Sequence, residues 1–501
     1  MRFSRSLPLL AVAVAIVTAT APVTLGHAQP PTTGGRPAPA AATAAATAAP
    51  APARTKRVDP ATKAQVVLHP GDTYETTFTS AGGQGVIDLT AWAPGTDWQV
   101  EGDESATASI YLDGEYATDL LVPGATKLAR QLQLGDLTAG RHSLRFSFNA
   151  SHSAPRAAVI ALAAISASTV AAGDPGYVAL AHSPILYGRS LAAYGGPMQN
   201  SWTDAPLVAW HYSTPNPDGT TSLEYQIVWS NEDGGTDTEP PSEQARWGRM
   251  TDIEWIYRVT VDAQGNTVPN SETFQAPAHV TSTFTGVHEG DHPVLQTCTD
   301  NNNVCDTVTN ASMRFFLSTV PTMNAATQAR EQIMDMFPWT YAIMGKEMIR
   351  EHHTEAKGNP ATAELSDARN YLYVVIRKTT SNPTGNASSP WVGVSVGVKL
   401  KGDKTVYRSD HDIPAYSLQR DGLDATDVEL PPGTTVSDIQ RIDVIRFPTS
   451  VRADPGYSAT VSAMTRAYLL DRKYQPITPF LTWSGTIILT KEHPTATVWQ
   501  R

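Results

Sequence analysis

Two segments decide the fold class of this chain: LEYQIVW at residues 223–229 and IEWIYRVTV at residues 253–261. Both alternate with a period of two, which is typical of half-buried strands. Asp262 to Gly265 follow the second segment and have the composition of a hairpin turn. Between the two segments lies a polar loop at 230–237 with two glycines. We therefore predict an antiparallel sheet with one buried face and polar loops at its end.

Strand patterns continue on both sides of this sheet. Toward the N-terminus, Asp113-Gly114 separates two short apolar runs, and this dipeptide favours the type I′ turn of a hairpin. Short strands at regular spacing predict a β-sandwich over residues 60–168. Residues 360–501 again show strand patterns, whereas only residues 325–357 show convincing helical ones.

The predicted fold class is therefore mainly β. We expect an N-terminal β-sandwich of jelly-roll type, followed by a larger antiparallel β-rich body at 175–501. That body contains a helical insertion at about 325–357 and could divide near residue 360.

The N-terminus has the pattern of a secretory signal peptide. Arg2 and Arg5 precede an apolar run, and Gly26-His27-Ala28 matches a small-x-small cleavage site. The run is too short to span a bilayer, so we expect cleavage near Ala28, export, and no transmembrane segment afterwards. Residues 29–58 are nearly all Pro, Ala, Thr and Gly, which predicts a semi-extended tether in a bacterial exported protein.

Composition and motifs exclude several function classes. The 501 residues carry a net charge of −11, which argues against nucleic-acid binding. Two cysteines cannot form a disulfide scaffold. The pattern Gly-x-Ser-x-Gly occurs at residues 393–397, but within a predicted strand and not at the strand-to-helix turn of a nucleophile elbow. The chain has no phosphate-binding loop and no dinucleotide-binding glycine pattern. Nucleotide chemistry and α/β-hydrolase chemistry are not expected.

Two parts of the chain resemble known proteins. Residues 60–168 are similar to the jelly-roll accessory modules of secreted carbohydrate-active proteins. That resemblance implies glycan binding, with Trp92 and Trp98 as stacking platforms, unless both tryptophans are core residues.

The second resemblance covers residues 179–306. An Ala-x-x-Pro-x-x-Tyr segment at 181–187, Thr-Asp-Ile-Glu-Trp at 251–255 and His-Pro-Val-Leu at 292–295 occur in the order seen in the vacuolar-protein-sorting-related family. It implies a β-sandwich-like fold and no specific reaction. Ile253 replaces the Trp of that family, and the closing His-Ala-x-Tyr segment is absent.

Acidic residues define the preferred candidate site. Asp252 and Glu254 are two apart on one predicted strand, so their side chains share a face about 6.6–6.8 Å apart along it. Such a pair could hold the water of an inverting glycosidase, or simply form a solvated face. Glu232, Asp233 and Asp237 end the neighbouring strand and would converge on them if the strands pair.

Three arginines are expected near these acids. Arg246 and Arg249 could neutralise the cluster or bind an acidic substrate. Arg258 is expected on the face of Asp252 and Glu254, as a substrate ligand or an ion-pair partner.

The segment His288-Glu289-Gly290-Asp291-His292 concentrates ligand-capable side chains in a loop. It could bind a transition metal, and His292 could instead act as a general acid or base. A plain polar loop is the alternative.

Cys298 and Cys305 are predicted to form a disulfide, because the chain is expected to be exported. The enclosed and flanking Asp300, Asn302 and Asp306 offer oxygen ligands for a Ca²⁺ ion. Local Asx-turn hydrogen bonding is the alternative explanation.

Together these features predict a secreted or surface-tethered carbohydrate-active protein that acts on a polysaccharide or cell-surface glycan. As an enzyme it would be a hydrolase or lyase using acids of the 230–292 region. The alternatives are a non-catalytic glycan- or calcium-binding adhesion protein and a secreted effector.

Overall fold

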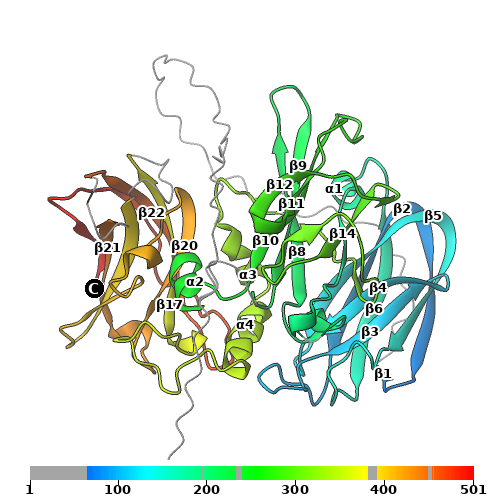
Figure 1. Cartoon of the computed structure of the whole chain (residues 1–501), viewed down its shortest axis with the longest axis horizontal. Helices are drawn as coiled ribbons and strands as arrows, with labels where there is room; N and C mark the ends of the chain where they lie inside the picture. Colours follow the sequence, from blue (N-terminus) through cyan, green and yellow to red (C-terminus); the bar gives the residue numbers. More distant parts are fainter. Residues whose placement is uncertain (1–64, 195, 233–239, 382–391, 449–453, 455) are drawn as a thin grey trace, which may run out of the picture. The chain divides into compact units, whose positions relative to one another are not determined.

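The computed structural model describes residues 65–194, 196–232, 240–381, 392–448, 454 and 456–501. The chain separates into two units, residues 1–52 and 53–501, and every described residue belongs to the second. This part is mainly β, with several antiparallel sheets and few helices (Figure 1), which confirms the predicted fold class. No helix in the described ranges is long and apolar enough to cross a membrane.

The N-terminal sheet has six strands in the order β1-β6-β2-β5-β3-β4. The strands are β1 (Val66–Leu68), β2 (Thr73–Trp92), β3 (Ala106–Leu112), β4 (Glu115–Val122), β5 (Leu128–Phe148) and β6 (Ile160–Val170). The turn between β3 and β4 has positive φ at Asp113 (51°) and Gly114 (93°), as a type I′ turn requires. The long strands β2 and β5 pair from Thr73↔Ser147 to Ala91↔Leu128 and run side by side in Figure 1.

The two tryptophans of this region are core residues. Trp98 is fully buried, and its Nε1 donates a 3.0 Å hydrogen bond to Glu347 Oε2. Trp92 is 8% exposed, and Lys127 Nζ lies 4.6 Å from its ring centroid. Neither ring is free to stack on a sugar, so the core interpretation is correct.

Two five-stranded sheets form the middle of the chain. The first has the order β12-β11-β10-β9-β8 and comprises β8 (Pro206–Pro215), β9 (Thr221–Trp229), β10 (Ile253–Val261), β11 (Thr273–Ala276) and β12 (Val280–Thr283). The second comprises β13 (His288–Glu289), β14 (His292–Thr297), β7 (Ile185–Tyr187) and β16 (Arg314–Phe315), with β15 (Val304–Cys305) paired to β14. The two segments that predicted a sheet are β9 and β10, and they pair antiparallel.

The C-terminal region contains two four-stranded sheets, ordered β20-β17-β22-β23 and β19-β18-β21-β24. Their strands are β17 (Tyr371–Thr380), β18 (Val392–Leu400), β19 (Val406–Arg408), β20 (Gly422–Glu429), β21 (Ile439–Pro448), β22 (Ala459–Leu469), β23 (Trp483–Leu489) and β24 (Thr495–Gln500). Both sheets contribute apolar side chains to one hydrophobic cluster, for example Val374 from β17 and Val396 from β18. This arrangement is that of two packed sheets.

The α-helices are short: α1 (Tyr177–Ala181), α2 (Pro240–Trp247), α3 (Ile333–Met336) and α4 (Trp339–Arg350). The 3₁₀ segments are η1 (Ala192–Tyr194), η2 (Gln199–Ser201), η3 (Pro277–His279), η4 (Arg330–Gln332), η5 (Ala368–Asn370), η6 (Pro414–Tyr416) and η7 (Val436–Asp438). The predicted insertion at 325–357 begins too early, because Asn324 Oδ1 accepts from the Ala326 N–H and forms a local turn instead. Helix α2 was not predicted.

A second hydrophobic cluster contains buried residues from Leu68 to Tyr474 and connects the N-terminal sheet, the central sheets and α4. The cluster of the C-terminal sheets runs from Leu372 to Val498. The divisions expected between 168 and 175 and near 360 stay predictions.

Candidate functional site

Pairing of β9 with β10 brings acidic residues together at one end of the sheet. Ile253 lies opposite Val228, and the Trp229 N–H donates a 2.9 Å hydrogen bond to the Asp252 carbonyl. Glu232 follows β9 and Asp252 precedes β10, so the pairing assumed in the sequence analysis is present. Asp233 and Asp237, the other two acids predicted here, lie outside the described residues.

Helix α2 adds a carboxyl group, Glu243, in its first turn. Glu243 is 4% exposed, and its side chain is hydrogen-bonded to that of Glu232. Burial, followed by the charge and hydrogen bond of Glu243, raises the pKa of Glu232 to about 10. Burial also raises the pKa of Glu243 to about 7, because the hydrogen bond from Glu232 and the charge of Arg249 only partly offset it. At neutral pH Glu232 therefore holds a proton and Glu243 is near its titration midpoint.

Asp252 is the third buried carboxyl group, with 2% exposure. Its Oδ2 accepts a 3.0 Å hydrogen bond from Asn302 Nδ2, which also donates to the Asn231 carbonyl. Burial and the charges of Glu232 and Glu254 raise the pKa of Asp252. The pKa of Asp252 therefore depends on whether the neighbouring acids are ionised.

Two arginines, Arg249 and Arg330, oppose this negative charge. Arg249 is 2% exposed, its guanidinium donates to the Thr251 carbonyl, and its Nε lies 4.0 Å from Glu331 Oε1. Burial lowers the pKa of Arg330, but the charges of Glu331, Glu254 and Asp252 outweigh this and raise it. Arg249 thus lies where the sequence analysis expected a neutralising cation.

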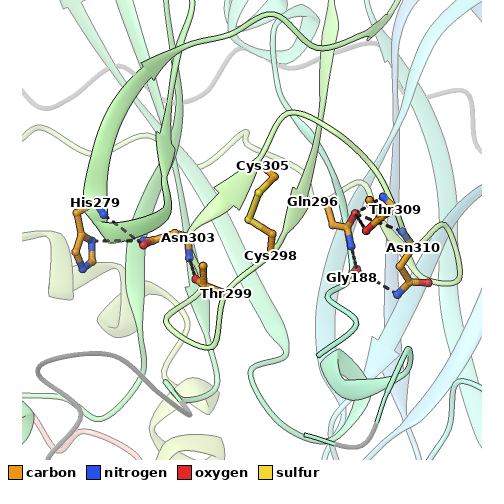
Figure 2. The surroundings of a disulfide bond; sticks show 9 residues. All are labelled: Gly188, His279, Gln296, Cys298, Thr299, Asn303, Cys305, Thr309 and Asn310. Carbon is orange, nitrogen blue, oxygen red and sulfur yellow. Dashed lines mark hydrogen bonds between the residues drawn. A yellow bond between two sulfur atoms is a disulfide. The ribbon is translucent and has the colours of Figure 1, made fainter. Parts of the chain in front are cut away.

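Glu254 is bound by residues of the neighbouring strand and its following turn. Gln275 Nε2 donates a 2.7 Å hydrogen bond to Glu254 Oε2, and His279 Nδ1 lies 3.8 Å from Glu254 Oε1. The backbone at Ala278 and His279 has positive φ, 61° and 57°, a conformation that non-glycine residues adopt mainly at special sites. Figure 2 shows His279 next to Asn303, whose Nδ2 lies 3.4 Å from His279 Nδ1.

A cavity of about 270 Å³ adjoins the carboxyl pair. Glu232, Glu243, Asn231, Glu351 and His353 are among its lining residues. Asn231 Nδ2 donates to Glu351 Oε2 over 2.9 Å, and His353 Nε2 lies 3.7 Å from the same oxygen. Ligand pockets start at about 300 Å³, so this cavity is near the lower limit for a small ligand. A cavity with carboxyl groups of raised pKa is the preferred candidate site in this chain.

His292, a predicted catalytic residue, lies in different surroundings. It is 2% exposed, its Nδ1 makes a 2.9 Å hydrogen bond with the Ser183 carbonyl, and its ring centroid is 4.8 Å from that of Phe316. Burial lowers the pKa of His292 to about 4. The described contacts of this imidazole involve none of the cluster carboxyls; His279 approaches Glu254 instead.

Of the other two predicted arginines, Arg258 is placed differently, whereas Arg246 lies near the acidic cluster as expected. The register between β9 and β10 shifts between Trp255 and Tyr257, so Arg258 does not share the face of Glu254 as expected. Arg258 stacks over Trp255 at 3.6 Å and binds Glu224 at 2.5 Å. Arg246 lies 5.1 Å from the ring centroid of Trp247, and its charge acts on Glu243.

The predicted disulfide between Cys298 and Cys305 is confirmed, with Cα atoms 5.9 Å apart (Figure 2). Inside its loop, Thr299 Oγ1 accepts from the Asn303 N–H over 2.9 Å. The loop is therefore held by local turn hydrogen bonds as well as by the covalent bridge.

The three predicted calcium ligands have separate partners. Asp300 Oδ2 accepts from the Tyr194 hydroxyl at 3.1 Å, and Asp306 Oδ2 accepts from the Thr285 N–H at 2.9 Å. Asn302 faces Asp252, as described above. The described contacts do not bring these three side chains together. The calcium site stays a prediction.

The side chains of the histidine-rich segment 288–292 likewise bind separate partners. His288 Nε2 lies 2.7 Å from Glu272 Oε1, and Glu289 forms two hydrogen bonds of 2.9 and 2.8 Å with Arg314. Within the described ranges, no group of three or more His, Cys, Asp and Glu side chains is arranged to hold a metal ion.

Sequence reasoning missed several groups of the site. Glu243 could have been found, because Pro240-Pro241 marks a helix start and Gly248, at φ 60°, marks its end. Asn301, whose Nδ2 donates to Glu232 Oε1 over 2.6 Å, reaches the site from a distant part of the sequence. No local pattern signals such a contact.

Comparisons with known proteins find no matching family model and no matching curated protein. The resemblance to the vacuolar-protein-sorting-related family therefore stays a prediction.

Solved structures match parts of the chain. A Paenibacillus cycloisomaltooligosaccharide glucanotransferase is 17% identical over 20% of this chain and 13% of its own, with a TM-score of 0.15. A CBM36 domain of a xylanase from the Trinervitermes trinervoides hindgut metagenome is 12% identical over 19% of this chain and 74% of its own, with a TM-score of 0.15. The sugar-binding C-terminal domain of EclA is 16% identical over 22% of this chain and 80% of its own, with a TM-score of 0.17.

This chain spans only 13% of the glucanotransferase. At such identities and TM-scores the matches establish neither a family nor an activity.

Proposed function

We propose that this protein is a carbohydrate-active protein that performs general acid–base chemistry on a glycan in the cavity of Glu232 and Glu243. One observation carries the proposal: two hydrogen-bonded carboxyl groups line that cavity, with pKa values of about 10 and about 7. At neutral pH one group can donate a proton while the other can accept one.

The pair can return to its starting state in one cycle. In hydrolysis, Glu232 gives its proton to the glycosidic oxygen as the bond from that oxygen to carbon breaks. Glu243 takes a proton from the water that adds to the carbon, and the hydrogen bond between the two side chains passes it back. In elimination, Glu243 takes a carbon-bound proton instead, the leaving oxygen again receives the proton of Glu232, and no water adds. Asp252 and Arg249 set the charge around the pair.

The experiment uses the full chain and a panel of neutral and acidic polysaccharides, with soluble products identified by mass spectrometry. Water-added ends would indicate a hydrolase and unsaturated ends a lyase. Glu232→Gln and Glu243→Gln keep the side-chain shape and should each remove product formation. Glu289→Gln is the matched control, because that side chain is 47% exposed and pairs with Arg314. Products formed equally by all three variants would refute the proposal.

A non-catalytic glycan-binding protein is the second candidate, and the same hydrogen bond favours it. Carboxyl groups of glycosidases are separated by about 5–5.5 Å or 6.5–9.5 Å, which is wider than a directly hydrogen-bonded pair. Uncharged carboxyl groups can instead bind sugar hydroxyls. Retention of one polysaccharide without products would select this candidate. Export, expected from residues 1–28, would bring the site to extracellular glycans; the N-terminal sequence of the secreted protein tests it.

A further inference from the structure

A second and larger cavity, of about 450 Å³, shares no lining residue with the first. It is lined by parts of β2, β5, β6 and β8 and by the segments around Leu317 and Trp339. Most of this lining is apolar, with Leu207, Phe337 and Trp339 as large members. One lining residue, Arg130 of β5, carries a full positive charge.

Arg130 is nearly inaccessible, with 7% of its surface exposed. Its Nη2 donates a 3.2 Å hydrogen bond to the Leu207 carbonyl, and its Cζ lies 4.9 Å from the ring centroid of Trp339. Its Nη1 is buried and has no hydrogen-bond partner among the described residues. No carboxylate in the described ranges forms an ion pair with this guanidinium, and burial alone shifts its pKa.

A buried cation of this kind is costly unless an anion compensates it. Burial alone lowers the pKa of Arg130 to about 10, so the group remains charged at neutral pH without any acidic neighbour to stabilise it. Asp88 also lines the cavity, but its Oδ1 accepts a 2.8 Å hydrogen bond from Gln131 Nε2. Gln131 Oε1 in turn accepts from the Ser318 hydroxyl at 2.7 Å. The Asp88 carboxylate at this cavity is thus hydrogen-bonded to Gln131.

The backbone of β6 is irregular at the cavity. Asp88 pairs with Ser166 and Thr90 pairs with Ala163, so β6 has an extra residue at this point. Ala164, in this bulge, has a φ of 49° and lines the cavity. Bulges of this type redirect side chains next to binding sites.

We propose that this cavity binds the carboxylate of an acidic sugar, a uronate, with Arg130 as its counter-ion. The planar guanidinium matches a carboxylate, and among the described residues Nη1 has no hydrogen-bond partner that would compete with one. The aromatic and apolar lining suits the C–H face of a sugar ring. The choice of a sugar acid among organic carboxylates rests on the proposed function, whereas the anion site rests on Arg130 alone.

The test is isothermal titration of the full chain with glucuronate, with galacturonate and with the methyl ester of each acid. The ester keeps the sugar shape and removes the charge. At least one acid should bind about tenfold to a hundredfold more tightly than its ester, which is the range of a charged hydrogen-bonded contact. Arg130→Met should abolish the difference. Arg145→Met is the matched control, because Arg145 lies on the same strand and stacks over Tyr111 at 3.7 Å.

Equal affinity for acid and ester, wild-type affinity in Arg130→Met, or no binding of either acid would each overturn the proposal. Preferential binding of a sulfated sugar would overturn the carboxylate assignment. If Arg130→Met does not fold, the acid–ester comparison on the wild-type chain still decides. Uronate binding without cleavage of any polysaccharide would refute the enzymatic function and leave this site standing. Cleavage of a polysaccharide without uronate binding would refute this site and leave the enzymatic function standing.

Discussion

Replacing Glu232 with Gln should stabilise the folded protein at neutral pH while removing its proton donor. Gln is uncharged, and its amide can keep both contacts of the protonated acid: a donor to Glu243 and an acceptor for Asn301 Nδ2. The variant therefore mimics the state that the wild-type folded protein adopts at pH 7. Buried functional acids commonly reduce stability in this way.

The size of the effect follows from the pKa of Glu232, which is about 10 in the folded protein against the ordinary 4.5. Because the folded-state pKa is the higher one, the folded protein keeps a proton that the unfolded chain releases. The stability of wild type is complete below the ordinary pKa and falls as the pH rises toward the folded-state pKa. At about 1.4 kcal/mol per pH unit, the loss is under about 1 kcal/mol at pH 5, about 3–4 kcal/mol at pH 7 and about 5 kcal/mol at pH 8.

Urea unfolding of both proteins, followed by tryptophan fluorescence at pH 5 and pH 8, measures this difference. The free energy of unfolding of Glu232→Gln should exceed that of wild type by several kcal/mol at pH 8 and by little at pH 5. The control Glu289→Gln should show no gain that grows with pH. A difference that is constant with pH would refute the reasoning, because Glu232 would then ionise alike in the folded and unfolded chains.

Three further predictions concern the same molecule. If products form, the rate should rise as the pH passes about 7, the pKa of Glu243, because the ionised form of Glu243 accepts the proton; a rate independent of pH from 5 to 9 would exclude Glu243 as the base. Trp98→Phe removes the donor to Glu347 and should lower the free energy of unfolding by about 1–3 kcal/mol; an unchanged thermal midpoint would show that this hydrogen bond contributes little. Changing Cys298 and Cys305 together to Ser should destabilise the protein by about 2–3 kcal/mol in urea, and a reductant should affect wild type equally but not the variant.

Local patterns were sufficient for the strands and for one covalent bond. The alternation in β9 and β10, the Asp-Gly turn after β3 and the short spacing of the two cysteines are all readable within a few residues. They could be predicted because strand period, turn conformation and loop closure depend on neighbours in the sequence. The convergence of Glu232 with Asp252 also followed from one pairing between adjacent strands.

Residue types by themselves did not show how every candidate residue is placed. His292 was selected because histidines and acids are concentrated around it, yet its ring is buried against Phe316. Arg258 was assigned to the wrong face because a bulge in β10 reverses the alternation. A sequence pattern of period two does not show where a strand contains an irregular residue.

The sequence by itself determined that this chain is mainly β and where most strands run, and it indicated that acids of neighbouring strands meet if those strands pair. Only the tertiary structure decided that Glu243 contacts Glu232, that His279 approaches Glu254, and that Arg130 lies beside Trp339 with no acidic partner among the described residues. These contacts join residues of different structural elements, and Arg130 and Trp339 are also far apart in the chain. They are set by how sheets, helices and loops pack, and burial, which sets the pKa values of these groups, is a property of that packing alone.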